Sequence, residues 1–162
     1  MACFTSKTFM VYDDYMTPKS TWEDIKDFLP KDKIIWEAFY GDGNSGKHLT
    51  DLGFNVIHRP INFFDNNEGD IIVSNPPFSK VKEVLTRCKI LGKPFVLILP
   101  SSNINTQYMR NLFKDEKDPL QIIIPRKRID FEKIVDGKKV ECKNRCNFDC
   151  FYYCWRMNLS KD

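Results

Sequence analysis

The residues best suited to chemistry lie in the stretch "DIIVSNPPFSK" (70–80), where an apolar run meets two consecutive prolines. Because a proline lacks the backbone N–H that a strand ladder needs, the chain must leave the sheet there. That turn would aim two hydrogen-bond acceptors, the Asn75 side-chain oxygen and the Pro76 carbonyl, at one point beside the flat ring of Phe78. Two acceptors and a ring suit a planar substrate with an amine, since they would orient the amine and clamp the base.

A second stretch is "EAFYGDGNSG" (37–46), in which Gly41, Gly43 and Gly46 form a G-x-G-x-x-G pattern. It follows a predicted strand and opens a predicted helix, the context in which such glycines let the backbone approach a ligand closely. Glu37 precedes Gly41 by four residues, and an acid there suits a cationic ligand, such as the sulfonium and ammonium of S-adenosylmethionine. A plain strand-to-helix turn is the simpler interpretation.

Two other interpretations of this glycine-rich loop fit poorly. A dinucleotide site needs an acidic residue about 20 positions further on, to hold a ribose. The second predicted strand ends instead at His58 and Arg59, and Asp65 comes only later. A phosphate loop needs Ser or Thr after its Gly-Lys pair, whereas Lys47 is followed by His48.

Alternating strand and helix patterns must position these loops. The expected strands are 33–40, 53–59, 70–75, 94–100, 120–125 and 148–157, and the expected helices are 21–29, a segment that ends near Leu52, 80–91 and 105–115. This order predicts an α/β fold, a single doubly wound (Rossmann-like), mostly parallel sheet with a C-terminal antiparallel hairpin. The strand ends at 39–41 and 74–76 would then lie side by side at the carboxyl edge, where ligands bind.

The first predicted helix has a clear start signal. Ser20 can cap it, and Glu23 follows three residues later, as in a capping box. Pro30 would end the helix. Large apolar residues recur between these points at helical spacing and predict its buried face: Trp22, Ile25, Phe28 and Leu29.

The chain has 162 residues, 42% of them hydrophobic, and a net charge of +3, which predicts one soluble domain (1–162). We expect no membrane span and no signal peptide, and hence an intracellular protein. Segment 126–147 holds eight Lys or Arg against four Asp or Glu, and its Asp-Gly pair predicts a hairpin tip. It is either a solvated hairpin or an arm that contacts nucleic acid through Arg126, Lys127 and Arg128.

Four of the six cysteines, Cys142, Cys146, Cys150 and Cys154, repeat every four residues. Zinc sites usually combine C-x2-C pairs that are well separated, so this spacing is different. On a strand, Cys150 and Cys154 would point to one face and pack there. Reduced structural cysteines are the favoured interpretation, with a metal site and a redox role as alternatives, and we assign no metal ligand.

Together, these motifs resemble the amino-methyltransferases of the class I S-adenosylmethionine-dependent fold, whose hallmark is (D/N)-P-P-(Y/F/W). "NPPF" (75–78) matches the hallmark, and "EAFYGDGNSG" (37–46) resembles the cofactor loop. "DYMTPKSTW" (14–22), "NFFD" (62–65) and the tail "RIDF…GKK…FDCFYYCW" (128–155) resemble segments of DNA adenine-N6 methyltransferases, in particular small phage- or large-virus-encoded ones. The resemblance spans nearly the whole chain.

The resemblance implies S-adenosyl-L-methionine as cofactor, covered by the N-terminal segment 1–30. The residues that would hold its methionine end are Tyr15, Thr17, Pro18 and Lys19. Its amino-acid and ribose portion would contact Glu37, Gly41 and Gly43, and its adenine would contact Asn62 and Phe63. The residues that would hold the target amine are Asn75, Pro76, Pro77 and Phe78.

The implied activity is methyl transfer to an exocyclic amine, with adenine N6 of DNA as the preferred target and DNA favoured over RNA as partner. A duplex base would first have to be flipped out of the stack. We expect no separate target-recognition domain, so a protein partner or the basic hairpin would supply recognition. If the protein is viral, it would act in the cytoplasm or nucleus of a host cell.

Other activities remain open, because the same tetrapeptide type serves RNA and protein (glutamine) amino-methyltransferases. A degenerate, non-catalytic binding subunit is a further alternative. It is favoured by His58, where many members have an acid for the ribose, and by Asn62, where many have Asp. The intact Asn75–Phe78 motif disfavours it. A zinc-binding adaptor built on 142–154 is the third alternative.

Overall fold

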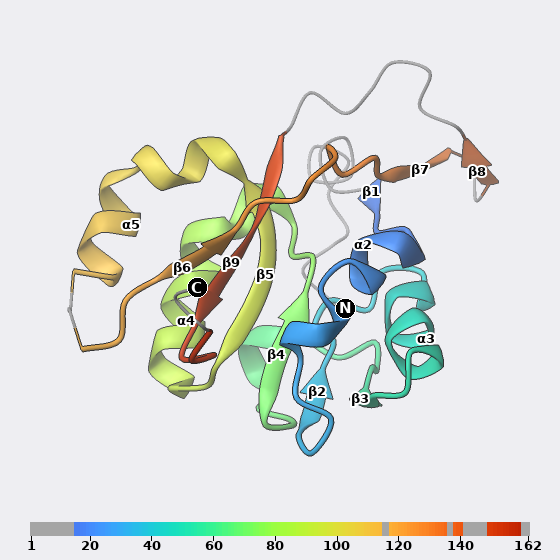
Figure 1. Cartoon of the computed structure of the whole chain (residues 1–162), viewed down its shortest axis with the longest axis horizontal. Coiled ribbons are helices and arrows are strands. Elements are labelled where there is room, and N and C mark those ends of the chain that lie inside the picture. Colours follow the sequence, from blue (N-terminus) through green and yellow to red (C-terminus); the bar gives the residue numbers. More distant parts are fainter. Residues whose placement is uncertain (1–14, 115–116, 136–137, 141–148, 160–162) are drawn as a thin grey trace.

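The computed structural model describes residues 15–114, 117–135, 138–140 and 149–159. Its centre is a six-stranded sheet in the order β3-β2-β4-β5-β9-β6 (Figure 1). The strands are β2 (Ile34–Trp36), β3 (Asn55–Ile57), β4 (Ile71–Ser74), β5 (Phe95–Pro100), β6 (Gln121–Ile123) and β9 (Cys150–Trp155). The pairs from β3 to β5 are parallel, and β9 is antiparallel to both β5 and β6.

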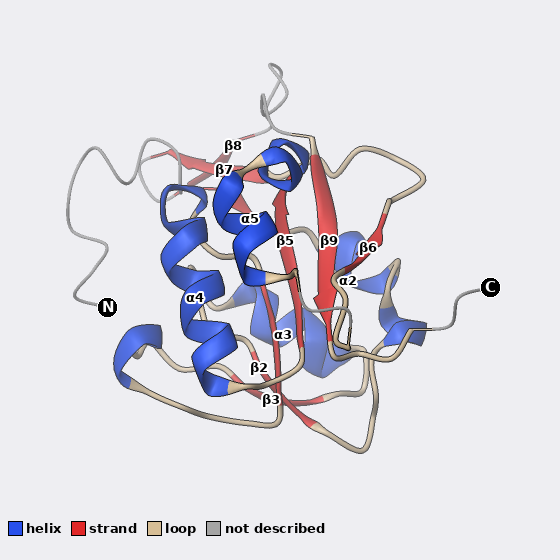
Figure 2. Cartoon of the chain, turned by 90° about the vertical axis from the view of Figure 1, so that its left-hand side faces the viewer, coloured by secondary structure: helices blue, strands red, loops and turns tan. Residues whose placement is uncertain are grey.

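Helices cover both faces of this sheet, with α4 and α5 on one side and α2 and α3 on the other (Figure 2). The helices are α2 (Lys19–Glu23), α3 (Asn44–Asp51), α4 (Val81–Leu91) and α5 (Gln107–Leu112), with the 3-10 turns η2 (Lys26–Phe28), η3 (Phe63–Asp65), η4 (Phe78–Lys80) and η5 (Ser101–Asn105). The predicted doubly wound, mostly parallel α/β sheet is thus confirmed.

Strand residues alternate between two buried clusters, as the pleat requires. On the α2 and α3 side, Val96 and Ile98 pack in the same cluster as Trp22. On the α4 and α5 side, Leu97 packs in the same cluster as Leu85. The sheet is buried on both faces, which explains why its strands read as continuous apolar runs.

A second, three-stranded sheet has the order β1-β7-β8 and lies at the upper end of the molecule in Figure 1. It comprises β1 (Tyr15–Met16), β7 (Glu132–Val135) and β8 (Lys138–Val140). β7 and β8 form the predicted antiparallel hairpin. β7 also pairs with β1, which sequence reasoning did not anticipate, so the basic segment is joined to the N-terminal segment.

The start of the first helix was predicted wrongly. α2 begins at Lys19, one residue before the expected cap Ser20, and its flanking residue Pro18 makes no side-chain cap hydrogen bond. Pro18 is extended, and its carbonyl instead accepts from the Thr21 N–H at 3.1 Å to begin the first turn. The helix gives way to η2, and this change of winding leaves Phe28 47% exposed although Trp22, Ile25 and Leu29 are buried.

Two other expectations concern strand bounds and cysteines. β2 ends at Trp36, so residues 37–40 lie beyond the strand that was predicted to include them.

Cys150 and Cys154 are buried in one cluster, as predicted, and burial raises the pKa of Cys154 to about 12. Cys142 and Cys146 lie outside the described residues. In the described part of the chain, no group of three His, Cys, Asp or Glu side chains is arranged for a metal ion.

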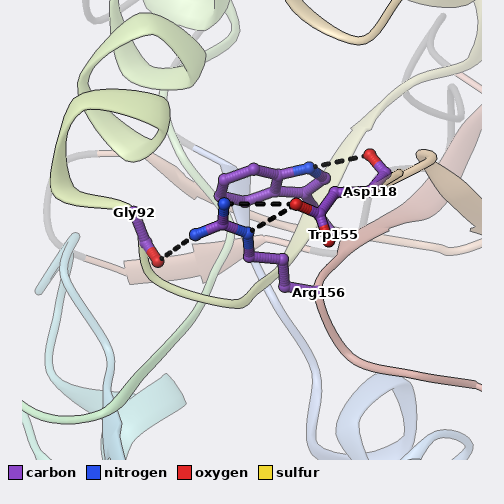
Figure 3. A network of polar contacts seen from close by, with 4 residues as sticks. All are labelled: Gly92, Asp118, Trp155 and Arg156. Carbon is purple, nitrogen blue, oxygen red and sulfur yellow. Dashed lines mark hydrogen bonds and ion pairs between the residues drawn. The ribbon is translucent and has the colours of Figure 1, made fainter. Parts of the chain in front are cut away.

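The chain is locked at the end of β9 by a compact polar network (Figure 3). The Arg156 guanidinium lies 4.2 Å from the centroid of the Trp155 ring and donates to Asp118 Oδ2 at 3.2 Å and to the Gly92 carbonyl at 2.9 Å. Trp155 Nε1 donates to the Asp118 carbonyl at 3.1 Å. These contacts tie β9 to the turn after α4 and to the segment before β6.

No helix among the described residues is long and apolar enough to cross a membrane.

Candidate active site

The two chemically interesting loops leave neighbouring strands where the sheet changes direction. The chain runs from β2 outward to β3 and then returns to β4 on the other side of β2. Trp36 pairs with Ile72, which places Glu37 beside the carboxyl half of β4. Ligands of open α/β sheets bind at such a switch point. The ends of these two strands therefore lie side by side, as predicted.

The glycine loop turns sharply between β2 and α3. Gly41 and Gly43 have φ of 58° and 84°, in the left-handed region that favours glycine. The Gly43 N–H donates to the Tyr40 carbonyl at 2.8 Å and closes the turn. Asp42 Oδ1 accepts from the Asn44 N–H at 2.9 Å, at the start of α3. The turn leaves Gly41 exposed at the sheet edge, whereas Gly43 is buried against the Tyr40 ring.

Gly46, the third glycine of the pattern, has a different role. A Cβ atom at this position would lie only 2.1 Å from His58 Cγ, so the missing side chain makes room for the His58 ring. That ring stacks on Tyr40, with centroids 6.0 Å apart and an interplanar angle of 12°. Its Nδ1 is buried and has no hydrogen-bond partner among the described residues. His58 therefore braces β3 against α3 at the place where an acid was expected.

Glu37 is only 1% exposed and faces into the protein. One carboxyl oxygen, Oε1, accepts from the Ser74 hydroxyl and from the Phe39 N–H, the latter at 3.1 Å. Burial raises the pKa of Glu37 to about 8, although hydrogen bonds from Ser74, Phe39 and Ser45 oppose the shift. The carboxyl thus links the glycine loop to the residue that precedes Asn75.

The Asn75–Phe78 motif leaves the sheet directly after β4. Pro76 and Pro77 are buried, whereas Asn75 and Phe78 are half-buried. Pro77 has φ −63° and ψ 127°, and its carbonyl accepts from the Lys80 N–H at 3.0 Å, which closes η4. The Phe78 ring packs edge-on against Phe131, with centroids 5.9 Å apart. The motif is therefore held against the residues that lead into the basic hairpin.

The predicted adenine contacts, Asn62 and Phe63, lie at the start of η3, after β3. Asn62 Oδ1 accepts from the Phe64 N–H at 2.9 Å and so caps η3. Phe63 is 2% exposed and packs against Trp36 and Phe39, with ring centroids 5.4 and 4.9 Å away. In this structure, Asn62 shapes the turn and Phe63 supports the glycine-loop side of the sheet.

The predicted covering segment follows β1, which contains Tyr15. Thr17 is 4% exposed, and its hydroxyl has no partner among the described residues. Pro18 is half-buried and Lys19 is exposed. Met16 Sδ lies 3.1 Å from the position of a Cβ at Gly41, so β1 touches the glycine loop.

Helix α2 anchors the N-terminal segment to α3 and to β9. Trp22 Nε1 donates to Ser45 Oγ in α3 at 3.1 Å, and Tyr152 Oη in β9 donates to the Thr21 carbonyl at 2.7 Å. The roles of Ser45 and Ser74 were missed from the sequence. A hydroxyl that ends the apolar run of β4 was the one available signal.

The predicted nucleic-acid contacts precede β7. Arg126 and Lys127 are exposed, and Arg128 is half-buried. Arg128 Nε forms an ion pair with Asp149 Oδ1 at 2.9 Å, so part of its charge is neutralised within the chain. The structure leaves Arg126 and Lys127 as the better-exposed cations of this group.

The arrangement is suited to S-adenosylmethionine as a ligand. Gly41 offers exposed backbone without a side chain, the Thr17 hydroxyl lacks a protein partner among the described residues, and the Glu37 carboxyl is buried next to the loop. These groups could hold a polar, cationic molecule at the sheet edge. The chemistry of the residues present therefore fits the expected cofactor.

No protein-family model and no curated protein matches this chain. Similar solved structures include the tRNA (m1A58) methyltransferase TrmI of Aquifex aeolicus, with 16% identity, coverage of 88% of this chain and 69% of the other, and a TM-score of 0.44. The precorrin-6y C5,15-methyltransferase of Geobacter metallireducens has 11% identity, 96% and 98% coverage, and a TM-score of 0.43. An S-adenosylmethionine-dependent O-methyltransferase of Thermotoga maritima has 12% identity, 89% and 66% coverage, and a TM-score of 0.43.

Proposed function

We propose that the chain is an S-adenosylmethionine-dependent N-methyltransferase that acts on adenine N6 of DNA. The observation that carries the proposal is the hydrogen bond from Ser74 to Glu37. It joins the acid ahead of the glycine loop to the residue directly before Asn75. A place for a cation and a place for an amine thus meet at one sheet edge. Methyl transfer requires this juxtaposition, because the donor and the accepting nitrogen must be held in line.

Each group of residues would have a separate role in the reaction. Bound at the glycine loop, S-adenosylmethionine would supply an activated methyl group. The Asn75 side-chain oxygen and the Pro76 carbonyl would accept the two N–H groups of the amine and turn its lone pair toward the methyl group. Phe78 would stack on the base, which must be flipped out of a duplex to reach it. Catalysis is then positioning and stabilisation of charge that develops on the amine.

Transfer of a tritiated methyl group to separate DNA, RNA and protein pools tests the activity. We expect label on adenine in DNA. Asn75→Ala should lower transfer at least about 100-fold, since one acceptor is lost from the transition state. Its affinity for S-adenosylhomocysteine should stay near wild type. Asn105→Ala, at an exposed asparagine in η5, is the matched control and should behave as wild type.

The label also identifies the partner. Arg126 and Lys127 are exposed ahead of the hairpin and could contact phosphates, so transfer to DNA should weaken with added salt. Label found in RNA or on glutamine, and not in DNA, would show that the substrate is RNA or protein. Normal transfer by Asn75→Ala would refute the assigned amine site. If the purified chain methylates DNA without sequence preference, a protein partner would be the source of target recognition.

A non-catalytic binding subunit is the second candidate. Two observations favour it: Phe63 is almost completely buried, and Phe78 already packs against Phe131. In the enzyme, the cofactor adenine would have to contact the Phe63 ring and the target base would have to contact the Phe78 ring. Calorimetry with S-adenosylhomocysteine separates the candidates, because a chain that does not bind it is not the proposed enzyme.

A further inference from the structure

A series of hydrogen bonds crosses the candidate site and joins its four segments. Trp22 Nε1 in α2 donates to Ser45 Oγ in α3 at 3.1 Å. The Ser45 side chain is hydrogen-bonded to the Glu37 carboxyl, which also accepts from the Ser74 hydroxyl. The series therefore runs from the N-terminal segment, through the glycine-loop helix and the end of β2, to the residue before Asn75.

Ser74 is an unusual residue for its position. It is fully buried at the end of β4, after Ile71, Ile72 and Val73. Alanine would fill this place without a polar atom, whereas a buried hydroxyl must be hydrogen-bonded. The Ser74 hydroxyl meets that requirement only by donating to Glu37 among the contacts of the described residues. Packing alone therefore does not account for it.

Glu37, at the centre, is surrounded by neutral donors. Its pKa is raised to about 8 by burial, and no charged side chain among the described residues contributes to the shift. The carboxyl consequently carries a proton at neutral pH. Titratable side chains of the surrounding elements are exposed or half-buried: Lys19, Glu23, Tyr40, Asp42, Lys47, His48 and His58.

We propose that Ser45 and Ser74 are positioning residues that transmit the charge state of Glu37 between the two loops. This inference rests on the proposed function, which brings the ammonium group of the cofactor to the glycine loop. When that cation binds, the carboxyl O–H bond breaks and the proton leaves to the buffer, because a nearby cation favours the carboxylate. The carboxylate accepts more strongly than the acid, so the Ser74 hydroxyl is held more tightly and fixes Asn75 for the amine.

Calorimetry with S-adenosylhomocysteine, in two buffers of different ionisation enthalpy, measures the protons released on binding. Wild type should release close to one proton at neutral pH, and its affinity should rise almost tenfold per pH unit up to about pH 8. Glu37→Gln should release none and show a flat profile. The probe 5′-methylthioadenosine, which lacks the ammonium, should bind wild type without proton release.

Ser74→Ala gives the decisive variant, because Ser74 lies on the amine side of the site. Loss of its hydrogen bond should move the pH profile of S-adenosylhomocysteine affinity to higher pH and lower the affinity about tenfold at neutral pH. Ser45→Ala should shift the profile in the same direction and keeps the inference testable if Ser74→Ala does not fold. Thr50→Ala is the control, since it removes a hydroxyl that donates to the Gly46 carbonyl at 2.8 Å, outside the series.

The outcomes separate the two proposals. A wild-type chain that does not bind S-adenosylhomocysteine refutes the proposed function. A wild-type chain that binds it without proton release, or serine variants with the wild-type pH profile, overturn the positioning role and leave the methyltransferase proposal intact. A simple loss of stability would lower the melting temperature without moving the pH profile.

Discussion

The glycine loop and the Asn75–Phe78 motif reach the same sheet edge by opposite means. Gly41 and Gly43 adopt φ of 58° and 84°, which a side chain would strain. Pro77 has φ −63°, which any residue adopts. The glycine loop therefore requires residues without a Cβ atom in the folded state. The proline motif gains its stability because proline restricts the conformations of the unfolded chain. Substitutions should therefore lower the stability of the fold strongly at these glycines and only mildly at the prolines.

Gly46→Ala should cause the largest loss of stability among the substitutions. Alanine in a helix interior gains about 0.5–1 kcal/mol over glycine, but its Cβ would lie 2.1 Å from His58 Cγ and 2.5 Å from His58 Cβ. Overpacking of this kind costs about 1–3 kcal/mol or more, so the net result should be a loss of about 2 kcal/mol. Urea denaturation measures the loss, and His58→Ala in the same chain should restore part of it.

Gly53→Ala is the matched control for that variant. Gly53 has φ 96°, but its Cβ would meet only Lys31 Nζ, at 3.6 Å. Only backbone strain remains, which costs about 1 kcal/mol. If Gly46→Ala lost no stability or gained some, while Gly53→Ala lost about 1 kcal/mol, the His58 ring would move away without cost and would not brace β3 against α3.

Glu37→Gln should change how stability depends on pH. The pKa of Glu37 is raised from 4.5 to about 8, so the folded chain keeps a proton that the unfolded chain releases. Its contribution is complete below about pH 4.5 and is lost as the pH rises toward 8. Between about pH 5.5 and about pH 8.5, wild type should lose about 3 kcal/mol that the glutamine variant keeps. Urea denaturation at both pH values checks this, and parallel losses in the two proteins would contradict a buried, protonated carboxyl.

The strands and the two loops could be predicted because their signals are local. The apolar run 71–73, the glycine spacing at 41–46 and Gly92 at the end of α4 each report on neighbours in the sequence. The pairing of β1 with β7 could not be predicted, because two residues at 15–16 carry no periodicity and their partner lies more than a hundred residues away.

The candidate site was predictable in its loops but not in its connections. Nothing near Gly46 indicates that His58 fills its Cβ position, since the two come together only when β3 packs beside α3. Ser45 and Ser74 belong to no motif, and their hydroxyls gain meaning only from the burial of Glu37 between them. Phe63 matched a family pattern, but the structure packs its ring against Trp36 and Phe39.

Pro77→Ala should have the smallest effect and sharpens the comparison. Alanine can adopt φ −63° and ψ 127°, so the folded conformation survives. The loss comes from the freer unfolded chain and from part of a buried ring, together about 1 kcal/mol. Affinity for S-adenosylhomocysteine should not change, because the glycine loop is untouched, whereas methyl transfer should fall as the Asn75 side chain loses its fixed support. Calorimetry and the tritium assay on one preparation separate these effects. Weaker cofactor binding by Pro77→Ala, with normal transfer at saturation, would mean that the two loops do not divide the work in this way.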